Sequence, residues 1–513
     1  MTGGGILALV AYGTQNVILS GNPQMTYFYK AFKRYTHFAM ENITIPLEGP
    51  NELAYDAPVR LRAKIPRYGD LMSDLYFSFR IPDIYSKYLA PAGGRTAQWE
   101  FQWVRYLGAA IIQEATVLVG GQIIQRVDGT YLLTRALNDM DQDTFLKWKN
   151  LVGDVPELTS PATGVYAGGA AATGYPTVVQ NTTITTAQAN RPSIFGREIH
   201  VPLSFWFTEA ASQALPLIGL QSHECEIQLT LSPLANLYTV LDESGQRVNP
   251  DFHMVATTAE IIANNPKYAA SSDIGAQIRN FYTDFGVAAP ALNQLAIQPR
   301  LQGTFVYLPR DEQQLFAGRS LSYLIHRVTK FPFTGLFNRQ ILDVLTTNPI
   351  TRLTFVQRRS DAAQRNDFAN FTNWFKYPVA PFQLTPGTIP TPQISGLLIP
   401  NAQQEILRSV RVLCDGNEIQ EPKAAEYFNR LVPYKYLKGI GQDGLLVYSF
   451  QLEQSATQPS GSINASLIKN FQVELDVYPL PVNTNYTYTV DVYVETINWF
   501  EVASGMGGLK YAL

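Results

Sequence analysis

Alternation of apolar and polar residues with a period of two is the feature that most constrains the fold of this 513-residue chain. Successive side chains of a β-strand point to opposite faces of a sheet, so this pattern predicts strands with one buried face. It is clearest at residues 59–65, 75–81, 471–477 and 490–495. Helical spacing is sparse, and residues 133–148 predict one or two short helices. We therefore expect a protein built mainly of β-strands.

Glycine and proline are frequent along the chain, with 36 and 32 residues respectively. Short strands separated by such turn residues are typical of sandwiches and barrels. The length exceeds that of one ordinary hydrophobic core, which predicts at least two domains. Residues 156–192, 238–300 and 376–402 are expected to be long loops. Loops of this length are rare in compact domains unless they are functional or disordered, and we expect these on an outer surface.

The two halves of the chain repeat each other. Residues 117–125 (VLVGGQIIQ) resemble residues 412–420 (VLCDGNEIQ) at an offset of 295, and both predict two strands joined by a tight turn. Further along, a Ser-Phe pair precedes a predicted strand in each half, at residues 204–231 and 449–477. Two matches in the same order predict a duplicated β-domain. Two jelly rolls, each a sandwich of eight strands, fit this length.

Composition limits the partners of the chain. Charged residues make up 16%, below the roughly 25% of ordinary globular chains, so much of the surface is expected to be hidden, and a packed oligomer is one way to hide it. The 39 basic and 42 acidic residues give a net charge of −3, which argues against direct binding of a nucleic-acid backbone. Cys225 and Cys414 are expected to be free thiols. We expect neither a signal peptide nor a membrane span, because no apolar run approaches ~20 residues.

Four short motifs could support chemistry, and each has a structural explanation that we favour. His223-Glu224-Cys225-Glu226 could bind a metal, but in a strand the carboxylates would face away from the histidine. Asp70 and Asp74 could form an acid/base pair, yet a turn entering a strand is expected there. Gly505–Gly508 could form a dinucleotide-binding loop, but no helix follows it. Lys30–Arg34, with aromatic residues interleaved, could stack on nucleic acid, but it is short and isolated, and a lead-in to the first strand is expected there. The sequence therefore predicts no catalytic, cofactor-binding or metal-binding residues and no cofactor.

Motifs distributed along nearly the whole chain resemble the double jelly-roll major capsid proteins of nucleocytoplasmic large DNA viruses, especially those that infect algae and other protists. The segments with the resemblance, in family order, are residues 9–16, 21–26, 38–41, 69–71, 201–207, 214–218, 220–224, 448–450, 458–461 and 504–509. The chain departs from the family pattern at Cys225 and at Asn464–Ile468. Loop functions are therefore not carried over from the family.

The resemblance implies an all-β fold of two consecutive eight-stranded antiparallel jelly rolls with long loop insertions and a few short helices. It also implies homotrimers that approximate hexagons and tile an icosahedral virion shell. The family's capsomers contact neighbouring capsomers, minor capsid proteins beneath the shell and an inner membrane. The shell of this chain would assemble in the host cytoplasm, without direct contact to nucleic acid.

The expected domain organisation follows from these patterns. We expect an N-terminal arm at residues 1–26, a first jelly roll at 27–308, a linker at 309–322 and a second jelly roll at 323–513. The expected function is structural and not enzymatic. The alternatives are a carbohydrate-binding, lectin-like jelly roll and, third, a jelly-roll metalloenzyme. A compact trimer would distinguish the shell protein from a binding module, which could be a monomer.

Overall fold

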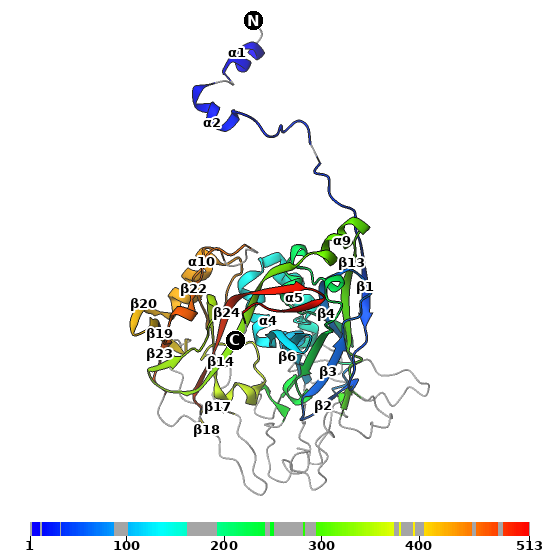
Figure 1. Ribbon diagram of the computed structural model, residues 1–513. Coiled ribbons are helices and arrows are strands. Elements are labelled where there is room, and N and C mark those ends of the chain that lie inside the picture. Colours follow the sequence, from blue (N-terminus) through cyan, green and yellow to red (C-terminus); the bar gives the residue numbers. More distant parts are fainter. Residues whose placement is uncertain are drawn as a thin grey trace. The chain divides into compact units, whose positions relative to one another are not determined.

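The computed structural model divides the chain into two compact units, Met1–Ala39 and Met40–Leu513 (Figure 1). It describes every residue except 1–2, 11–12, 31, 87–100, 162–191, 242–246, 251–280, 283–293, 374–378, 381–392, 395–404, 454–457, 481–485 and 512–513. The first unit contains helices α1 (Gly3–Val10) and α2 (Val17–Ser20), joined by the 3-10 turn η1 (Thr14–Asn16). The large apolar side chains that the structure describes in this unit are exposed, among them Ile18 and Phe28.

The first jelly roll consists of two four-stranded sheets. The β4 sheet contains, in spatial order, β1 (Ala39–Ile45), β13 (Arg300–Tyr307), β4 (Leu71–Ile81) and β8 (Arg197–Pro202). The β6 sheet contains β3 (Val59–Lys64), β9 (Cys225–Leu231), β6 (Ile112–Val119) and β7 (Gln122–Val127). The inward residues of both sheets, such as Phe77 and Ile227, are fully buried. The period-two pattern at 59–65 and 75–81 therefore marks the core face, as predicted.

The second jelly roll repeats this arrangement strand for strand. Its β16 sheet contains β14 (Leu321–Leu336), β24 (Tyr488–Ala503), β16 (Pro349–Arg359) and β21 (Leu445–Ser449), with β22 (Ile463–Asn464) and β25 (Met506–Leu509) added at β16 and β24. Its β19 sheet contains β15 (Gln340–Asp343), β23 (Phe471–Val477), β19 (Leu407–Cys414) and β20 (Asn417–Ala424). The all-β double jelly roll and the duplication predicted from sequence are confirmed.

The matched hairpins explain the sequence repeat. β6–β7 turns at Gly120-Gly121, and β19–β20 turns at Asp415-Gly416, all with positive φ. A left-handed backbone favours glycine, and asparagine or aspartate tolerates it, so both hairpins keep these residue types at the turn. The offset of 295 residues therefore relates equivalent positions of the two rolls.

Two of the three stretches expected to be loops contain strands. Within 238–300 lie β10 (Tyr238–Leu241), β11 (Arg247–Val248) and β12 (Gln294–Ala296), which pair with each other or with β5 (Phe101–Trp103) and β2 (Glu52–Ala54). The ring of Tyr238 stacks on Phe101, and this packing selects the strand. Within 376–402, β17 (Val379–Ala380) pairs with β18 (Gln393–Ile394). Most of 156–192 lies outside the described residues.

Helices connect the strands. The predicted helical segment forms α4 (Gly129–Asp139) and α5 (Gln142–Leu151), whose first turns are capped by Asp128 and Asp141. The other helices are α3 (Leu107–Ile111), α6 (Pro156–Thr159), α9 (Arg310–Gly318) and α10 (Val432–Tyr436). Short turns are η2 (Trp206–Thr208), η3 (Ala211–Gln213), η4 (Leu217–Gly219), η5 (Leu234–Asn236), η7 (Ser360–Arg365), the π-helical η8 (Tyr427–Leu431) and η9 (Ala465–Leu467).

The expected domain boundaries remain predictions, although the described elements lie close to them. Strand β1 begins at Ala39, inside the expected first roll, and α9 occupies the expected linker. Among the described residues, no helix is both long enough and apolar enough to cross a membrane.

The two jelly rolls share part of one core. Val356, Tyr493 and Phe500 belong to strands of the second roll, yet they pack in the hydrophobic cluster of the first. A separate cluster fills the second sandwich, with Phe355 and Val492 on the opposite faces of the same strands. Strands β16 and β24 are therefore buried on both faces, and their outer face forms the contact between the rolls.

Candidate functional site

The contact between the two jelly rolls is centred on α4, which belongs to the connection from β7 to β8. Figure 1 shows this helix between the first roll and strands β14 and β24. Nine of its eleven residues are buried. At the start of α4, a Cβ on Gly129 would lie 1.9 Å from the Ala109 carbonyl oxygen, so only glycine allows this approach.

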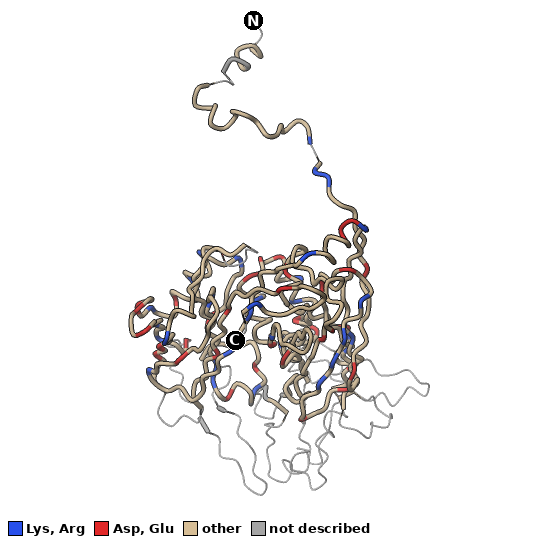
Figure 2. Tube along the Cα trace, in the orientation of Figure 1, with Lys and Arg blue, Asp and Glu red and all other residues tan. Residues whose placement is uncertain are grey.

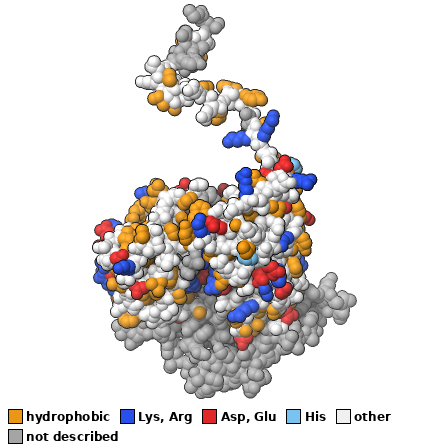
Figure 3. All heavy atoms as spheres, viewed as in Figure 1, with side chains coloured by type: hydrophobic (Ala, Val, Ile, Leu, Met, Phe, Trp, Pro, Cys, Tyr) orange, Lys and Arg blue, Asp and Glu red, His pale blue; other side chains and the backbone are white. Residues whose placement is uncertain are grey.

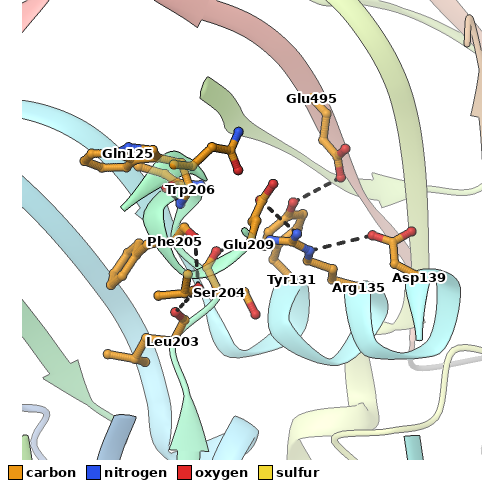
Figure 4. A network of polar contacts seen from close by, with 12 residues as sticks. Gln125, Tyr131, Arg135, Asp139, Leu203, Ser204, Phe205, Trp206, Glu209 and Glu495 are labelled. Atoms are coloured by element: carbon orange, nitrogen blue, oxygen red, sulfur yellow. Dashed lines mark hydrogen bonds and ion pairs between the residues drawn. The ribbon is translucent and has the colours of Figure 1, made fainter. Parts of the chain in front are cut away.

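Buried charges join α4 to the outer face of the β16 sheet. Arg352 Nη1 and Nη2 donate to the Asp139 carboxylate at 2.5 and 3.1 Å, and Nη2 also reaches Glu495 at 2.5 Å. Tyr131 Oη donates to Glu495 Oε1 at 3.1 Å (Figure 4). The Arg352 side chain is 3% exposed. Burial opposes its charge, but Asp139 and Glu495 outweigh burial and raise the pKa of Arg352.

A second arginine extends this network within the first roll. Figure 4 shows Arg135 of α4 between Asp139 and Glu209. Its guanidinium lies 2.8 Å from the Glu209 carboxylate and 3.7 Å from that of Asp139. Glu209 follows η2, so the arginine fastens the connection from β8 to β9 to the helix. The network therefore fixes two connections of the first roll, from β7 to β8 and from β8 to β9, against the second roll.

A lysine of β14 repeats the arrangement near the start of α4. Lys330 Nζ lies 3.2 Å from the Asp128 carboxylate and 3.0 Å from that of Asp491. Tyr493 Oη donates to Asp128 Oδ2 at 2.7 Å. Burial opposes the lysine charge, but the two aspartates raise the pKa of Lys330. Burial and Asp128 raise the pKa of Tyr493, so its hydroxyl stays protonated and donates.

The glycine-rich segment near the C-terminus has a structural role. Ser504 and Gly505 form the turn of the β24–β25 hairpin, and a Cβ on Gly507 would lie 2.6 Å from Leu220. His223 Nδ1 contacts the Gly507 carbonyl oxygen at 3.0 Å. This hairpin packs against the connection from β8 to β9 of the first roll. The segment thus closes the contact between rolls and forms no nucleotide-binding loop.

The other motifs singled out from sequence also have structural partners. Glu224 and Glu226 face Lys64 and Arg62 of β3, while Cys225 points into the core. Burial raises the pKa of the Cys225 thiol to about 12, and both cysteines are free. No three potential metal ligands converge anywhere in the described part of the chain. His223 and Glu224 precede strand β9, contrary to the expectation that they lie in it. The histidine contacts Gly507, whereas the glutamates pair with β3.

The two aspartates near residue 70 have separate environments. Asp70 accepts hydrogen bonds from Leu308 N at 2.8 Å and from Gln313 Nε2 at 3.0 Å, and so connects β4 to α9. Asp74 is half-buried, and burial raises the pKa of its carboxyl group. Within the described residues it has no hydrogen-bonding or ion-pairing partner. Lys30–Arg34 lies in the first unit, with Lys30 Nζ 6.0 Å from the Phe32 ring centroid.

Sequence reasoning did not find the charged network between the rolls. Asp491 and Glu495 alternate with valines, which indicates only a strand with a polar face. The available signal was the cluster of Arg352, Arg358 and Arg359 in an otherwise apolar segment. The carboxylate partners of Arg352, which are Asp139 on α4 and Glu495 on β24, lie 213 and 143 residues away in sequence, so this pairing could not be identified from local patterns.

Comparison with known proteins places the fold in a family. The chain matches the model for the major capsid protein N-terminus at residues 26–268 and that for the large eukaryotic DNA virus major capsid protein at residues 312–508. It is 29% identical to the major capsid protein of Pyramimonas orientalis virus, covering 99% of this chain and 100% of that protein. It is 26% identical to the major capsid protein of Paramecium bursaria Chlorella virus 1, covering 99% of both.

The solved structures agree on the fold. A quasi-atomic model of the PBCV-1 virus capsid superimposes with a TM-score of 0.63 at 19% identity, covering 95% of this chain and all of that one. These relatives are structural proteins of the virion capsid and not enzymes. They support the capsid interpretation over the lectin-like and metalloenzyme alternatives. The chain therefore belongs to the major capsid protein family of large eukaryotic DNA viruses.

Proposed function

We propose that three copies of this chain form a pseudo-hexagonal capsomer and that such capsomers tile an icosahedral shell. The observation that supports this proposal is the strand-for-strand duplication. Two similar jelly rolls per chain supply six similar units in a trimer, which approximates a hexagon. Closed rings of identical chains are the usual form of soluble oligomers. The low charge content agrees with extensive contact between copies.

The N-terminal arm is the proposed contact to the inner side of the shell. Its exposed apolar side chains include Ile18, Leu19 and Met25. Exposed apolar clusters of this kind mark surfaces for protein or membrane contact. We assign them to minor capsid proteins or neighbouring capsomers, close to an inner membrane. The shell is proposed to assemble in the host cytoplasm.

Direct contact with the genome is not part of the proposal. Figure 2 shows basic and acidic residues interspersed over the second unit. The net charge of −3 supplies no basic excess for a phosphate backbone.

Sedimentation of the purified chain tests the proposal. Obligate interfaces commonly bury ~2,000–5,000 Å², so we expect a trimer that survives dilution to micromolar concentration. A monomer under native conditions would contradict it. Deletion of residues 1–26 should leave the trimer folded but impair particle assembly, and normal particles from the deleted chain would refute the role of the arm.

A further inference from the structure

A groove lies between the outer face of the β6 sheet and strand β14, which is the end strand of the β16 sheet. The two rolls meet along it where Arg327 Nε of β14 donates to the Ile124 carbonyl oxygen of β7 at 3.0 Å. We call it the Arg327 groove. Its volume of about 1190 Å³ exceeds the roughly 300–1,000 Å³ that is usual for small-molecule sites, so an oligomeric ligand fits it.

Most of the charged side chains in the Arg327 groove are paired within the chain. Five basic and three acidic side chains line it. Arg126 Nε lies 3.3 Å from the Glu114 carboxylate, and Arg62 and Lys330 form the ion pairs described above. Glu48 is exposed, and its backbone pairs with that of Arg62. Three of the five basic side chains therefore have a carboxylate partner.

Two arginines of the groove have no carboxylate partner among the described residues. Arg60 on β3 is exposed, and Arg327 is half-buried. Arg327 donates only through Nε, so both terminal nitrogens of its guanidinium are without a partner in the described part of the chain. Burial lowers the pKa of Arg327, because no neighbouring carboxylate offsets the loss of water around the charge. A bound anion would provide that compensation.

The positions of the two arginines indicate the size of the anion. Arg60 lies on β3, and Arg327 rests on β7 at the opposite edge of the same sheet. Strands β9 and β6 lie between, so three strand spacings, or roughly 14 Å, separate β3 from β7. This separation favours a ligand with at least two anionic groups over a single ion. Basic and acidic side chains are interspersed over the face of the second unit in Figure 3, so two unpaired arginines are a local feature.

Neutral hydrogen-bonding groups make up much of the remaining exposed lining. Gln113, Gln228 and Thr329 are exposed, and their side chains have no hydrogen-bonding partner among the described residues. Amides and hydroxyls both donate and accept, as the hydroxyls of a sugar do. The two tyrosines in the described lining, Tyr131 and Tyr493, are buried and offer no face on which a nucleic-acid base could stack. A ligand rich in hydroxyl groups therefore fits the lining better than a nucleic acid.

We propose that the Arg327 groove binds an acidic oligosaccharide. Arg60 and Arg327 bind its carboxylate or sulfate groups, because the planar guanidinium matches both in geometry. Gln113, Gln228 and Thr329 hydrogen-bond to its hydroxyls between these two points. The groove lies within one chain, so this binding activity goes beyond the proposed function and does not depend on the trimer.

Calorimetric titration of the full-length chain tests the inference with three hexasaccharides. A sulfated heparin hexasaccharide and hexagalacturonic acid carry the two kinds of acidic group, and maltohexaose is the neutral control. At least one acidic probe should bind, and binding should weaken with added salt. Arg60→Gln and Arg327→Gln should each weaken it about 10- to 100-fold, since each removes a charged hydrogen bond. Arg319→Gln, at an exposed arginine outside the groove, should bind like the unmodified chain.

The probes also distinguish the source of the acidic group. Binding of the sulfated probe alone or of the carboxylated probe alone would support the inference and identify the group. Absence of binding by both acidic probes, or equal binding of maltohexaose, would overturn it. Hexaglutamate that binds as tightly as the acidic sugars would overturn the choice of a sugar. If Arg327→Gln does not fold, Arg60→Gln at its exposed position must still weaken binding, and unchanged affinity would show that the groove is not the site.

Discussion

Arg352 gives the sharpest test of how the two jelly rolls are held together. Replacing Arg352 with alanine leaves Glu495 with Tyr131 Oη at 3.1 Å and Asp139 with Arg135 at 3.7 Å. Glu495 is only 8% exposed, so its charge would remain buried without a cationic partner. Removing one member of a buried ion pair typically costs about 3–5 kcal/mol. We expect Arg352→Ala to lower the free energy of unfolding by this amount.

The assay is urea denaturation followed by circular dichroism, with a triple variant as comparison. Arg352→Met combined with Asp139→Leu and Glu495→Met replaces the three charged side chains with apolar ones of similar volume, and such replacements are often neutral or stabilising. The triple variant should therefore be more stable than Arg352→Ala. Lys64→Ala, which breaks the exposed pair with Glu224, should change stability little. A loss below about 1 kcal/mol for Arg352→Ala, or a triple variant less stable than the single one, would refute the reasoning.

Three further predictions concern other parts of the molecule. Lys330 and Tyr493 have folded-state pKa values above their unfolded values. Their contribution to the free energy of unfolding is therefore complete below about pH 10 and is lost as the pH rises through the folded values. Unfolding free energies that stay constant between about pH 9 and 11.5 would contradict this. Gly129→Ala should destabilise the fold by about 1–3 kcal/mol or more because its Cβ meets backbone oxygen, whereas Gly318→Ala meets open space and should be neutral in thermal denaturation. The Cys225 thiol, with a pKa of about 12, should resist alkylation at pH 8 in native protein and react after denaturation, as measured by mass spectrometry.

The local patterns of the sequence determined the strands and their duplication. Residues 59–65 and 471–477 alternate because each strand packs one face in a sandwich core, and that requirement acts on neighbouring residues. The two hairpins share turn residues because both backbones adopt positive φ at the turn. Helices α4 and α5 were also predictable, since their apolar spacing and aspartate caps lie within a few residues.

The strands inside 238–300 illustrate where local patterns were insufficient. β10 forms because Tyr238 stacks on Phe101 and its backbone pairs with β5, which lies more than 130 residues earlier. Such pairing depends on the arrangement of the sandwich and leaves no period in the segment itself. The stretch was therefore expected to be a loop.

Tertiary structure alone decided which polar faces are buried. Asp491, Tyr493 and Glu495 alternate with valines, as a strand with an exposed face would, yet all three are buried. Tyr493 and Glu495 contact Tyr131 of α4, and Asp491 pairs with Lys330 of β14. The physical reason is that a strand's sequence specifies two faces but not what lies against the second one. What covers the second face depends on contacts between distant residues, such as Tyr131 and Glu495, which are 364 residues apart and meet only in the folded chain.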